Sequence, residues 1–262
     1  MIEPGDPRLA PYARVGDPAW LLANNLFIAE GRLVVRRLFE TARYDVESVL
    51  VTPAAYAAMK DAWPEHVTVY VVEQEVLGRV TGFDFHRGCL ALARRPRAID
   101  VAEVVRPLRG VARRRLVALE GIGNPDNVGG IFRNAAAFGV DGVLLDPTSG
   151  DPLYRKAIRT SMGAALTVPF ARVEDWPGGL KGQGFRVLAL TPREDARSID
   201  DVAREQPERW ILLAGAEGPG LSERALKAAD IQVRIPMVDR IDSLNVTVAV
   251  GIGLSLLFSQ KR

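Results

Sequence analysis

Hydrophobic and polar positions follow one pattern in the first hundred residues and another in the rest of the chain. Up to about Pro96, helical spacing alternates with short β-branched runs, which predicts a small α/β unit. We expect helices at 24–43 and 54–62, and strands at 46–52, 67–72 and 88–93. From Leu116 onward, apolar strands alternate with longer helical stretches. There we expect strands at 116–120, 142–146, 186–191, 210–217 and 232–237, and helices at 127–138, 153–165, 222–229 and 246–258.

The strands of the second region are apolar along their whole length. Such strands are typical of a parallel sheet that is covered by helices on both faces. Ligands bind such sheets at the carboxyl ends of the strands. The loops after 116–120, 210–217 and 232–237 are therefore where we expect the chemistry.

The segment between the two regions is rich in arginine. Residues 94–115 hold eight arginines, two prolines and only two acidic residues. We interpret residues 99–114 as a basic linker between an N-terminal domain, 1–98, and a C-terminal domain, 115–262. Its charges either keep a connection solvated or contact phosphates.

Composition narrows the classes of function. The 262 residues carry a formal net charge of +2 and are 48% hydrophobic, which is typical of a globular protein. A single cysteine, Cys89, excludes an internal disulfide and a multi-cysteine zinc site, and we expect no metal. The two histidines, His66 and His86, both precede the second region, which argues against a Ser-His-Asp hydrolase.

Location can also be predicted. The N-terminus has neither the apolar run of a signal peptide nor the character of a transit peptide, so we expect a cytoplasmic protein. The apolar stretch 246–258 is shorter than the roughly 20 residues that a membrane-spanning helix needs. We expect it to be buried in a core or in a subunit interface.

The glycine-rich loops do not match the common nucleotide-binding motifs. Asp126 stands where a dinucleotide-binding loop needs its third glycine, and 215–220 lacks the Lys-Ser/Thr of a phosphate-binding loop. The remaining polar residues near the strand ends have little titratable character: Asn127, Arg133, Glu217, Ser243 and Asn245. Such a set suits a reaction in which an activated cofactor carries the chemistry and the protein orients the reactants.

Three segments carry a resemblance to a known family. Residues 127–140 are similar to the pattern Asn-x-Gly-x-x-x-Arg-x-Ala-x-x-Phe-Gly-Val, and 215–222 to Gly-x-Glu-x-x-Gly-x-Ser. Residues 235–246 are similar to Ile-Pro-Met-x-Gly-x-x-x-Ser-Leu-Asn-Val, except that Asp239 replaces the glycine. In this order, each after an expected strand, they resemble the SpoU/TrmH family of RNA 2′-O-ribose methyltransferases. Residues 26–34 and 88–91 also resemble parts of that family's ribosomal-protein-like RNA-binding domain.

The resemblance implies a fold and a cofactor. The C-terminal domain would be a parallel-sheet α/β domain with a deep trefoil knot of the SPOUT type. The cofactor would be S-adenosylmethionine, bound by Gly215, Gly220, Ile235, Met237 and Leu244. Glycines in such a loop would equally serve a tight turn, and Ile235 and Leu244 would equally suit a core.

The resemblance also implies roles for the polar residues. Arg133 would help to remove the 2′-hydroxyl proton by stabilising the alkoxide, since a guanidinium is too weak a base to take the proton. Asn127, Ser243 and Asn245 would position Arg133 and the ribose, and Glu217 would orient Arg133 or a group of a second subunit. Asn127 and Ser243 are equally suited to cap helices, and Glu217 to be a surface carboxylate.

The resemblance further implies partners and alternatives. We expect a homodimer that uses the final helix, and structured RNA as substrate, ribosomal RNA in preference to transfer RNA. Arg155, Lys156 and Arg159 are candidate phosphate contacts. The alternatives are a transfer-RNA 2′-O-methyltransferase, a non-catalytic RNA-binding or assembly protein of the same fold, and a base methyltransferase.

Overall fold

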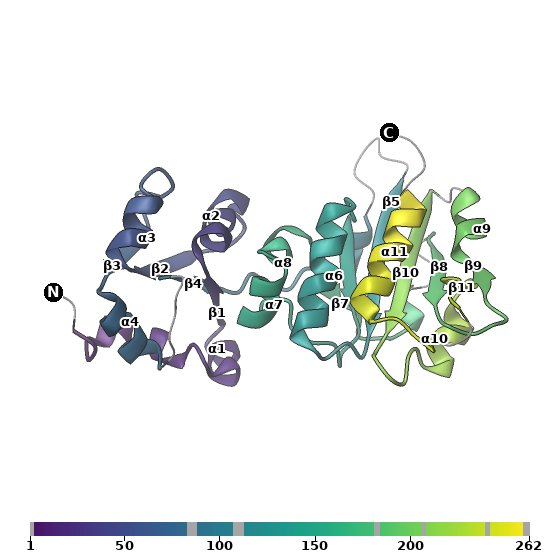
Figure 1. Cartoon of the computed structure of the whole chain (residues 1–262), viewed down its shortest axis with the longest axis horizontal. Coiled ribbons are helices and arrows are strands. Elements are labelled where there is room, and N and C mark those ends of the chain that lie inside the picture. Colours follow the sequence, from purple (N-terminus) through teal and green to yellow (C-terminus); the bar gives the residue numbers. More distant parts are fainter. Residues whose placement is uncertain are drawn as a thin grey trace. The chain divides into compact units, whose positions relative to one another are not determined.

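The computed structural model describes residues 3–82, 88–106, 113–180, 184–205, 208–238 and 242–258. The chain forms two compact units, drawn in Figure 1. One comprises Met1–Arg97 together with Pro152–Thr167, and the other comprises Ala98–Asp151 together with Val168–Arg262. Each unit contains its own sheet.

The N-terminal unit is built on a four-stranded mixed sheet of order β1-β4-β2-β3. Strand β2 runs parallel to β3, whereas β4 runs antiparallel to both β1 and β2. One buried cluster contains Leu50, Leu90 and Leu92 of the sheet and Leu77 and Val80 of α4. The elements are α1 Pro18–Ala23, β1 Leu26–Glu30, α2 Arg32–Thr41, β2 Val46–Val51, α3 Pro53–Ala58, β3 Thr68–Val71, α4 Gln74–Thr81 and β4 Cys89–Arg94.

The strands predicted in this unit are confirmed within a residue or two, but the helix predicted over 24–43 is wrong in its first part. Residues Leu26–Glu30 form strand β1, which is buried along its whole length. A short apolar run of this kind fits a buried strand or a buried helix equally well. Gly31, with φ of 98°, separates strand from helix because it adopts a backbone conformation that favours glycine. Helix α4 was not predicted.

Residues 152–167 belong to the N-terminal unit, although the sequence pattern places them in the second domain. The single helix predicted over 153–165 is two helices, α7 Arg155–Thr160 and α8 Ala164–Thr167. They are separated by Met162 and Gly163, whose φ values are 53° and 81°.

An ion pair joins this segment to β1. Arg155 Nη1 lies 2.6 Å from Glu30 Oε2, and the two side chains are only 18% and 7% exposed. Arg159 approaches the same carboxylate at 3.9 Å. Arg155, a candidate phosphate contact in the sequence, therefore balances a buried carboxylate instead.

The C-terminal unit is an α/β domain with a seven-stranded sheet of order β7-β6-β5-β10-β8-β11-β9. Every described strand pair in it is parallel, which confirms the predicted sheet type. The strands are β5 Arg114–Glu120, β6 Gly142–Leu145, β7 Phe170–Arg172, β8 Arg186–Leu190, β9 Arg197–Ser198, β10 Arg209–Gly215 and β11 Ile231–Arg234. The helices are α5 Val101–Val105, α6 Pro125–Ala137, α9 Ile199–Arg204, α10 Glu223–Ala228 and α11 Val246–Phe258.

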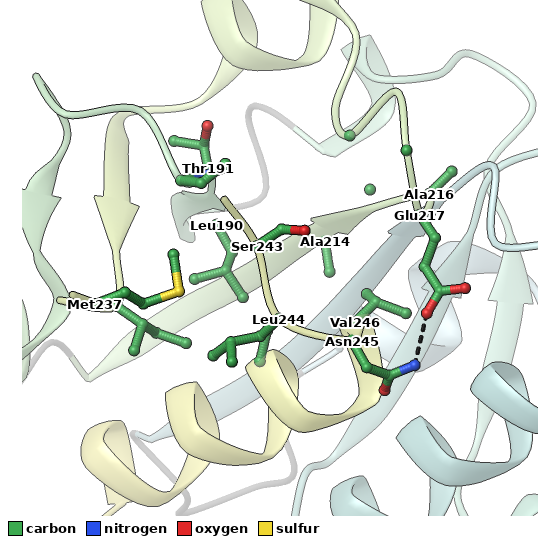
Figure 2. A pocket seen from close by; sticks show the side chains of 16 residues that line it. Leu190, Thr191, Ala214, Ala216, Glu217, Met237, Ser243, Leu244, Asn245 and Val246 are labelled. Carbon is green, nitrogen blue, oxygen red and sulfur yellow. Dashed lines mark hydrogen bonds between the residues drawn. The ribbon is translucent and has the colours of Figure 1, made fainter. Parts of the chain in front are cut away.

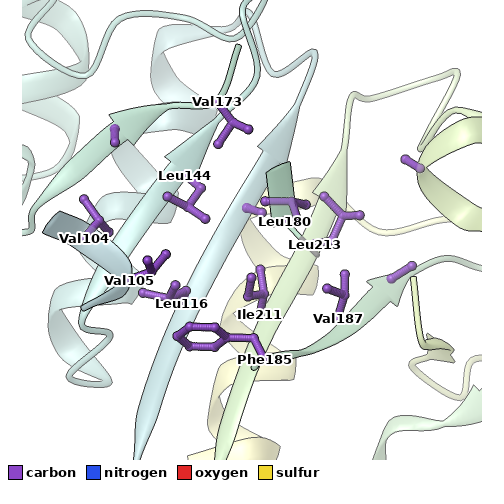
Figure 3. Close-up of a cluster of buried hydrophobic side chains, with 14 of the residues drawn as sticks. Val104, Val105, Leu116, Leu144, Val173, Leu180, Phe185, Val187, Ile211 and Leu213 are labelled. Atoms are coloured by element: carbon purple, nitrogen blue, oxygen red, sulfur yellow. The ribbon is translucent and has the colours of Figure 1, made fainter. Parts of the chain in front are cut away.

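The two faces of this sheet are covered by different helices. Ile211 and Leu213 of β10 belong to a core cluster that also includes residues of α5 and α10 (Figure 3). Leu212 points to the other face, where it packs close to Gly253 of α11. Helices α6 and α9 both pack against α11 on that side. In the part of the chain that the structure describes, no helix is long and apolar enough to span a membrane.

The arginine-rich segment carries structure of its own. Helix α5 begins with a capping box of Asp100 and Glu103 and buries Val104 and Val105. Arg114 is only 5% exposed, donates to the Val104 carbonyl and pairs with Asp141 at 3.4 Å. Arg114 is thus a structural residue, and Arg109 lies outside the described residues.

The pair of Glu30 and Arg155 gives a testable prediction. We expect Glu30→Gln to lower the free energy of unfolding by about 3 kcal/mol, because it removes the buried carboxylate that faces a largely buried guanidinium. The measurement is urea unfolding. Glu75→Gln is the matched control, since the Glu75–Arg79 pair is exposed and such pairs contribute about 1 kcal/mol at most. Equal losses in the two variants would contradict the role given to Glu30.

Candidate functional site

The carboxyl ends of the parallel strands form one edge of the C-terminal sheet. Strands β5 and β10 pair in register from Arg114 opposite Arg209 to Glu120 opposite Gly215. Strand β8 lies on the other side of β10, and β11 lies beside β8. The loops that leave these strands therefore start close together, as the sequence predicts.

A pocket of about 430 Å³ opens at this edge (Figure 2). Four segments line it that are far apart in the sequence. They are 190–192 after β8, 214–220 at the end of β10, 235–237 after β11, and 243–249 at the start of α11. The lining residues are Leu190, Thr191, Pro192, Ala214, Gly215, Ala216, Glu217, Gly218, Gly220, Ile235, Met237, Ser243, Leu244, Asn245, Val246 and Ala249.

The loop after β10 requires glycine for steric reasons. A Cβ atom on Gly215 would lie 2.4 Å from the Gly220 carbonyl carbon and from the Leu221 nitrogen, so two stretches of backbone touch there. Gly218 and Gly220 have φ values of 87° and 70°. The tight-turn interpretation of these glycines is therefore correct, and the same turn brings backbone groups to the pocket.

All five residues that were predicted to bind a cofactor lie on this pocket: Gly215, Gly220, Ile235, Met237 and Leu244. Figure 2 shows Met237 and Leu244 on one side of the pocket and Glu217 with Asn245 on the other. The pocket thus combines an apolar wall, a backbone wall and a polar end, which is the usual composition of a small-molecule site.

A chain of hydrogen bonds forms the polar end. Asn245 Nδ2 donates to Glu217 Oε1 at 2.6 Å and to Asn127 Oδ1 at 3.1 Å. Thr247 Oγ1 lies 3.3 Å from the same Asn127 oxygen. Three of the five predicted catalytic residues, from three separate motifs, are therefore joined directly.

The helix caps differ from those considered in the sequence. Asn124, not Asn127, caps α6, since its side chain accepts from the Asp126 N–H at 2.9 Å. Asn245, not Ser243, caps α11, because its Oδ1 accepts from Thr247 and Val248. Asn127 is freed for the pocket's hydrogen-bond chain, and Ser243 lies exposed at the pocket's edge.

Arg133 stands apart from this chain. It is exposed on α6 and makes no hydrogen bond or ion pair with the other described residues. It follows Asn127 by six residues, so the two point to different sides of a helix that repeats every 3.6 residues. The expected contact of Glu217 with Arg133 is absent from the described chain, and Glu217 binds Asn245 instead.

Two carboxylates that the sequence analysis did not select lie at neighbouring strand ends. Glu120 ends β5 and accepts hydrogen bonds from Trp176 and Ser222. Asp146 follows β6 and is 5% exposed. The only hint in the sequence is their position directly after an apolar strand.

Asp146 organises the segment that leads to α6. Its carboxylate accepts from the N–H groups of Gly121 and Ser149, and from the hydroxyls of Thr148 and Ser149. Burial opposes its charge, but the hydrogen bonds from Ser149, Thr148 and Gly121 outweigh burial and hold the pKa of Asp146 below its ordinary value. The start of the loop before Asn127 is fixed in this way.

The described ranges of the chain contain no cluster of side chains that could bind a metal ion. Within them, no three side chains of His, Cys, Asp or Glu come together as a metal-binding group. Cys89 is buried in the N-terminal unit, and burial raises the pKa of its thiol to about 12.

Comparison with known proteins decides the family. The sequence profile of the SpoU rRNA methylase family matches residues 114–255, more than half of the chain. An uncharacterized tRNA/rRNA methyltransferase of Mycobacterium bovis is 42% identical over 261 residues, which cover 96% of this chain and 88% of that protein. The chain belongs to the SpoU rRNA methylase family.

Solved structures resemble this SpoU family member over nearly its whole length. An S-adenosylmethionine-bound rRNA methyltransferase from Sinorhizobium meliloti has 25% identity and a TM-score of 0.77, with 96% of this chain and 94% of that chain covered. An RNA 2′-O ribose methyltransferase has 25% identity and a TM-score of 0.79, with 98% and 96% covered. The parallel-sheet fold is thus that of SpoU methyltransferases, while the trefoil knot stays a prediction.

One departure from the family pattern, Asp239, lies in a charged segment of the chain. Asp239 and Arg240 lie outside the described residues, whereas Asp242 is described and exposed.

The Asp146 network yields a prediction about pH. We expect Asp146→Asn to lower the free energy of unfolding at pH 7 by about 1–3 kcal/mol, because an amide cannot accept all of these hydrogen bonds. The aspartate pKa is about 3.9 in an unfolded chain and lower in this fold. The stabilisation is therefore complete above about pH 4 and is lost as the pH falls through the folded value. Urea unfolding of both proteins between pH 7 and pH 3 measures this, and a pH-independent difference would contradict it.

Proposed function

We propose that this SpoU family member transfers a methyl group from S-adenosylmethionine to a ribose 2′-hydroxyl of structured RNA, ribosomal RNA in preference to transfer RNA. The chain is an RNA methyltransferase of the SpoU family, and S-adenosylmethionine is the family's cofactor. The observation that carries the proposal is the pocket at the strand ends, where a backbone cradle meets the Glu217–Asn245–Asn127 chain.

The residues of the pocket fit the cofactor. A volume of about 430 Å³ falls within the usual range of small-molecule sites. Backbone groups of Gly215, Ile235 and Leu244 would bind its polar edges, Met237 would cover its apolar parts, and Gly220 would keep the loop free of a side chain. When bound, S-adenosylmethionine supplies an activated methyl carbon. The protein then needs to bring the ribose oxygen into line with it.

The polar residues would act by positioning and by charge. The guanidinium of Arg133 would stabilise the alkoxide that forms from the 2′-hydroxyl, or hold the adjacent phosphate. Asn127, Asn245 and Ser243 would orient the ribose, with Glu217 fixing the amide of Asn245. Because Arg133 is exposed and unpaired among the described residues, its charge is available to RNA.

Features outside the pocket support the proposed partners. The separate N-terminal unit would recognise RNA by shape and by unstacked bases. The exposed apolar Val248 on α11 supports a homodimer that uses this helix. A single buried cysteine supports a reducing compartment, the cytoplasm. The name of the Sinorhizobium meliloti structure, an rRNA methyltransferase, favours ribosomal RNA.

Gly215 tests the proposed cofactor site. We expect Gly215→Ala to reduce the affinity for S-adenosylmethionine at least tenfold, because the new methyl group forces the Gly220–Leu221 backbone away from β10. Isothermal titration calorimetry measures the affinity. Gly139→Ala is the control: its φ is positive, unlike that of Gly215, but no atom lies within 4 Å of its Cβ and it is not part of the pocket. Equal losses in both variants would contradict the site.

Arg133 tests the reaction. We expect Arg133→Ala to lower kcat about 10²- to 10³-fold while the affinity for S-adenosylmethionine stays unchanged, the cost typical of losing one charge-stabilising donor. Transfer of labelled methyl to unmodified ribosomal and transfer RNA, followed by digestion to nucleosides, gives both rate and product. We expect a 2′-O-methyl nucleoside from ribosomal RNA.

A control variant on the same unit is Arg204→Ala, since Arg204 is an exposed arginine paired only with Asp201 among the residues described. A labelled base would contradict ribose methylation. Cofactor and RNA binding without any transfer would support the non-catalytic alternative.

A further inference from the structure

Glu120 is the last residue of β5, and both of its carboxylate oxygens accept hydrogen bonds from other loops. Oε2 accepts from the Ser222 N–H at 2.8 Å, and Oε1 accepts from the Ser222 hydroxyl at 2.9 Å. Oε1 also accepts from the indole Nε1 of Trp176 at 2.8 Å. One side chain therefore binds the end of the loop after β10 and the segment after β7.

Ser222 is where the pocket loop ends. The loop leaves β10 at Gly215 and touches itself through the bridge between Ala216 and Gly220. Within the loop Glu217 binds Asn245, whereas the glycines carry no side chain that could anchor it. Ser222 closes it, because its hydroxyl also accepts from the Ala225 N–H at 3.1 Å and so caps α10.

The strand register places Glu120 beside the start of the loop, from where its carboxylate reaches Ser222 at the end of the loop. Glu120 lies opposite Gly215 in the parallel pair of β5 and β10, one strand away from the start of the loop. Its carboxylate thus joins the loop's last residue to the strand beside the loop's first residue. Glu120 does not line the pocket itself.

We propose that Glu120 is a positioning residue that sets the affinity for S-adenosylmethionine through Ser222, without touching the cofactor. The inference rests on the proposed cofactor site. Hydrogen bonds to a charged acceptor are stronger than those to a neutral one. In Glu120→Gln, one oxygen becomes an NH₂ group: in place of Oε2 it cannot accept from the Ser222 N–H, and in place of Oε1 it cannot accept from Trp176 or from the Ser222 hydroxyl. Either orientation weakens the hold on Ser222, while the residues that line the pocket are unchanged.

The contact with Trp176 supplies an independent readout. Its indole packs against the core cluster of the C-terminal unit and shares Oε1 of Glu120 with the Ser222 hydroxyl. Because the loop lines the pocket and ends at Ser222, binding of the cofactor is expected to alter this shared hydrogen bond. We expect a change in tryptophan fluorescence on addition of S-adenosylmethionine that is lost in Trp176→Phe.

The decisive experiment compares the full-length wild type with Glu120→Gln by calorimetry and by steady-state kinetics with RNA. We expect Kd and KM for S-adenosylmethionine to rise about tenfold, with kcat at saturating cofactor within about twofold and KM for RNA unchanged. Glu223→Gln is the matched control. It removes a carboxylate next to Ser222 that binds Arg193 and not the loop.

A double-mutant cycle with Ser222→Ala tests the route of the effect. If Glu120 acts through Ser222, the loss of affinity in the double variant is smaller than the sum of the two single losses, because both variants remove the bond between Glu120 and the Ser222 hydroxyl. Additive losses overturn the inference, as does an unchanged Kd or an equal change in kcat and in KM for RNA. If Glu120→Gln fails to fold, Ser222→Ala and the Trp176 signal decide in its place. A wild type that does not bind S-adenosylmethionine overturns the cofactor site itself, which is a separate result.

Discussion

The parallel pairing of β5 with β10 is the constraint on which the candidate site depends. Seven residue pairs hold the two strands in register and end them together at Glu120 and Gly215. Since every strand of a parallel sheet presents its carboxyl end at the same edge, the loops after β8, β10 and β11 meet there. The segment at the start of α11 completes the lining of the pocket. A shift of one residue in this pairing would separate Glu120 from the loop it holds.

The backbone and the side chains contribute differently to this pocket. The turn after β10 needs glycine because two stretches of main chain touch, which leaves peptide groups to face a ligand. The amides of Asn127 and Asn245 form the polar end, where Glu217 accepts from Asn245. The carboxylates at the strand ends anchor the loops. Such a site can bind and orient the reactants, but it contains few groups that could exchange protons with them. This fits a reaction in which the cofactor brings the reactive carbon.

Two arginines that were candidate phosphate contacts in the sequence form ion pairs within the fold instead. Arg114 pairs with Asp141 under α5, and Arg155 pairs with the buried Glu30. A buried guanidinium needs a counter-charge, so these residues hold elements together within their own units. Arg133, by contrast, is exposed and has no partner among the described residues. An arginine's usefulness to RNA therefore depends on what the fold places beside it, and not on how many arginines lie near it in the chain.

From the sequence alone we predicted the parallel sheet, five of its strands (β5, β6, β8, β10 and β11) and the helices α6, α10 and α11, because apolar strands and helical spacing leave strong local patterns. Strands β7 and β9 and helices α5 and α9 were not predicted, and the pocket residues were predicted from the resemblance to the SpoU/TrmH motifs. The sequence could not distinguish a buried strand from a helix at Leu26–Glu30, since five apolar or buried residues in a row have no diagnostic period. Only the tertiary structure decided that 152–167 joins the N-terminal unit, that Asn245 binds Asn127, and that Glu120 binds Ser222 at the end of the pocket loop. Each of these depends on which groups lie beside one another after folding, and hydrogen bonds and ion pairs across a hundred residues leave no periodic trace in the chain.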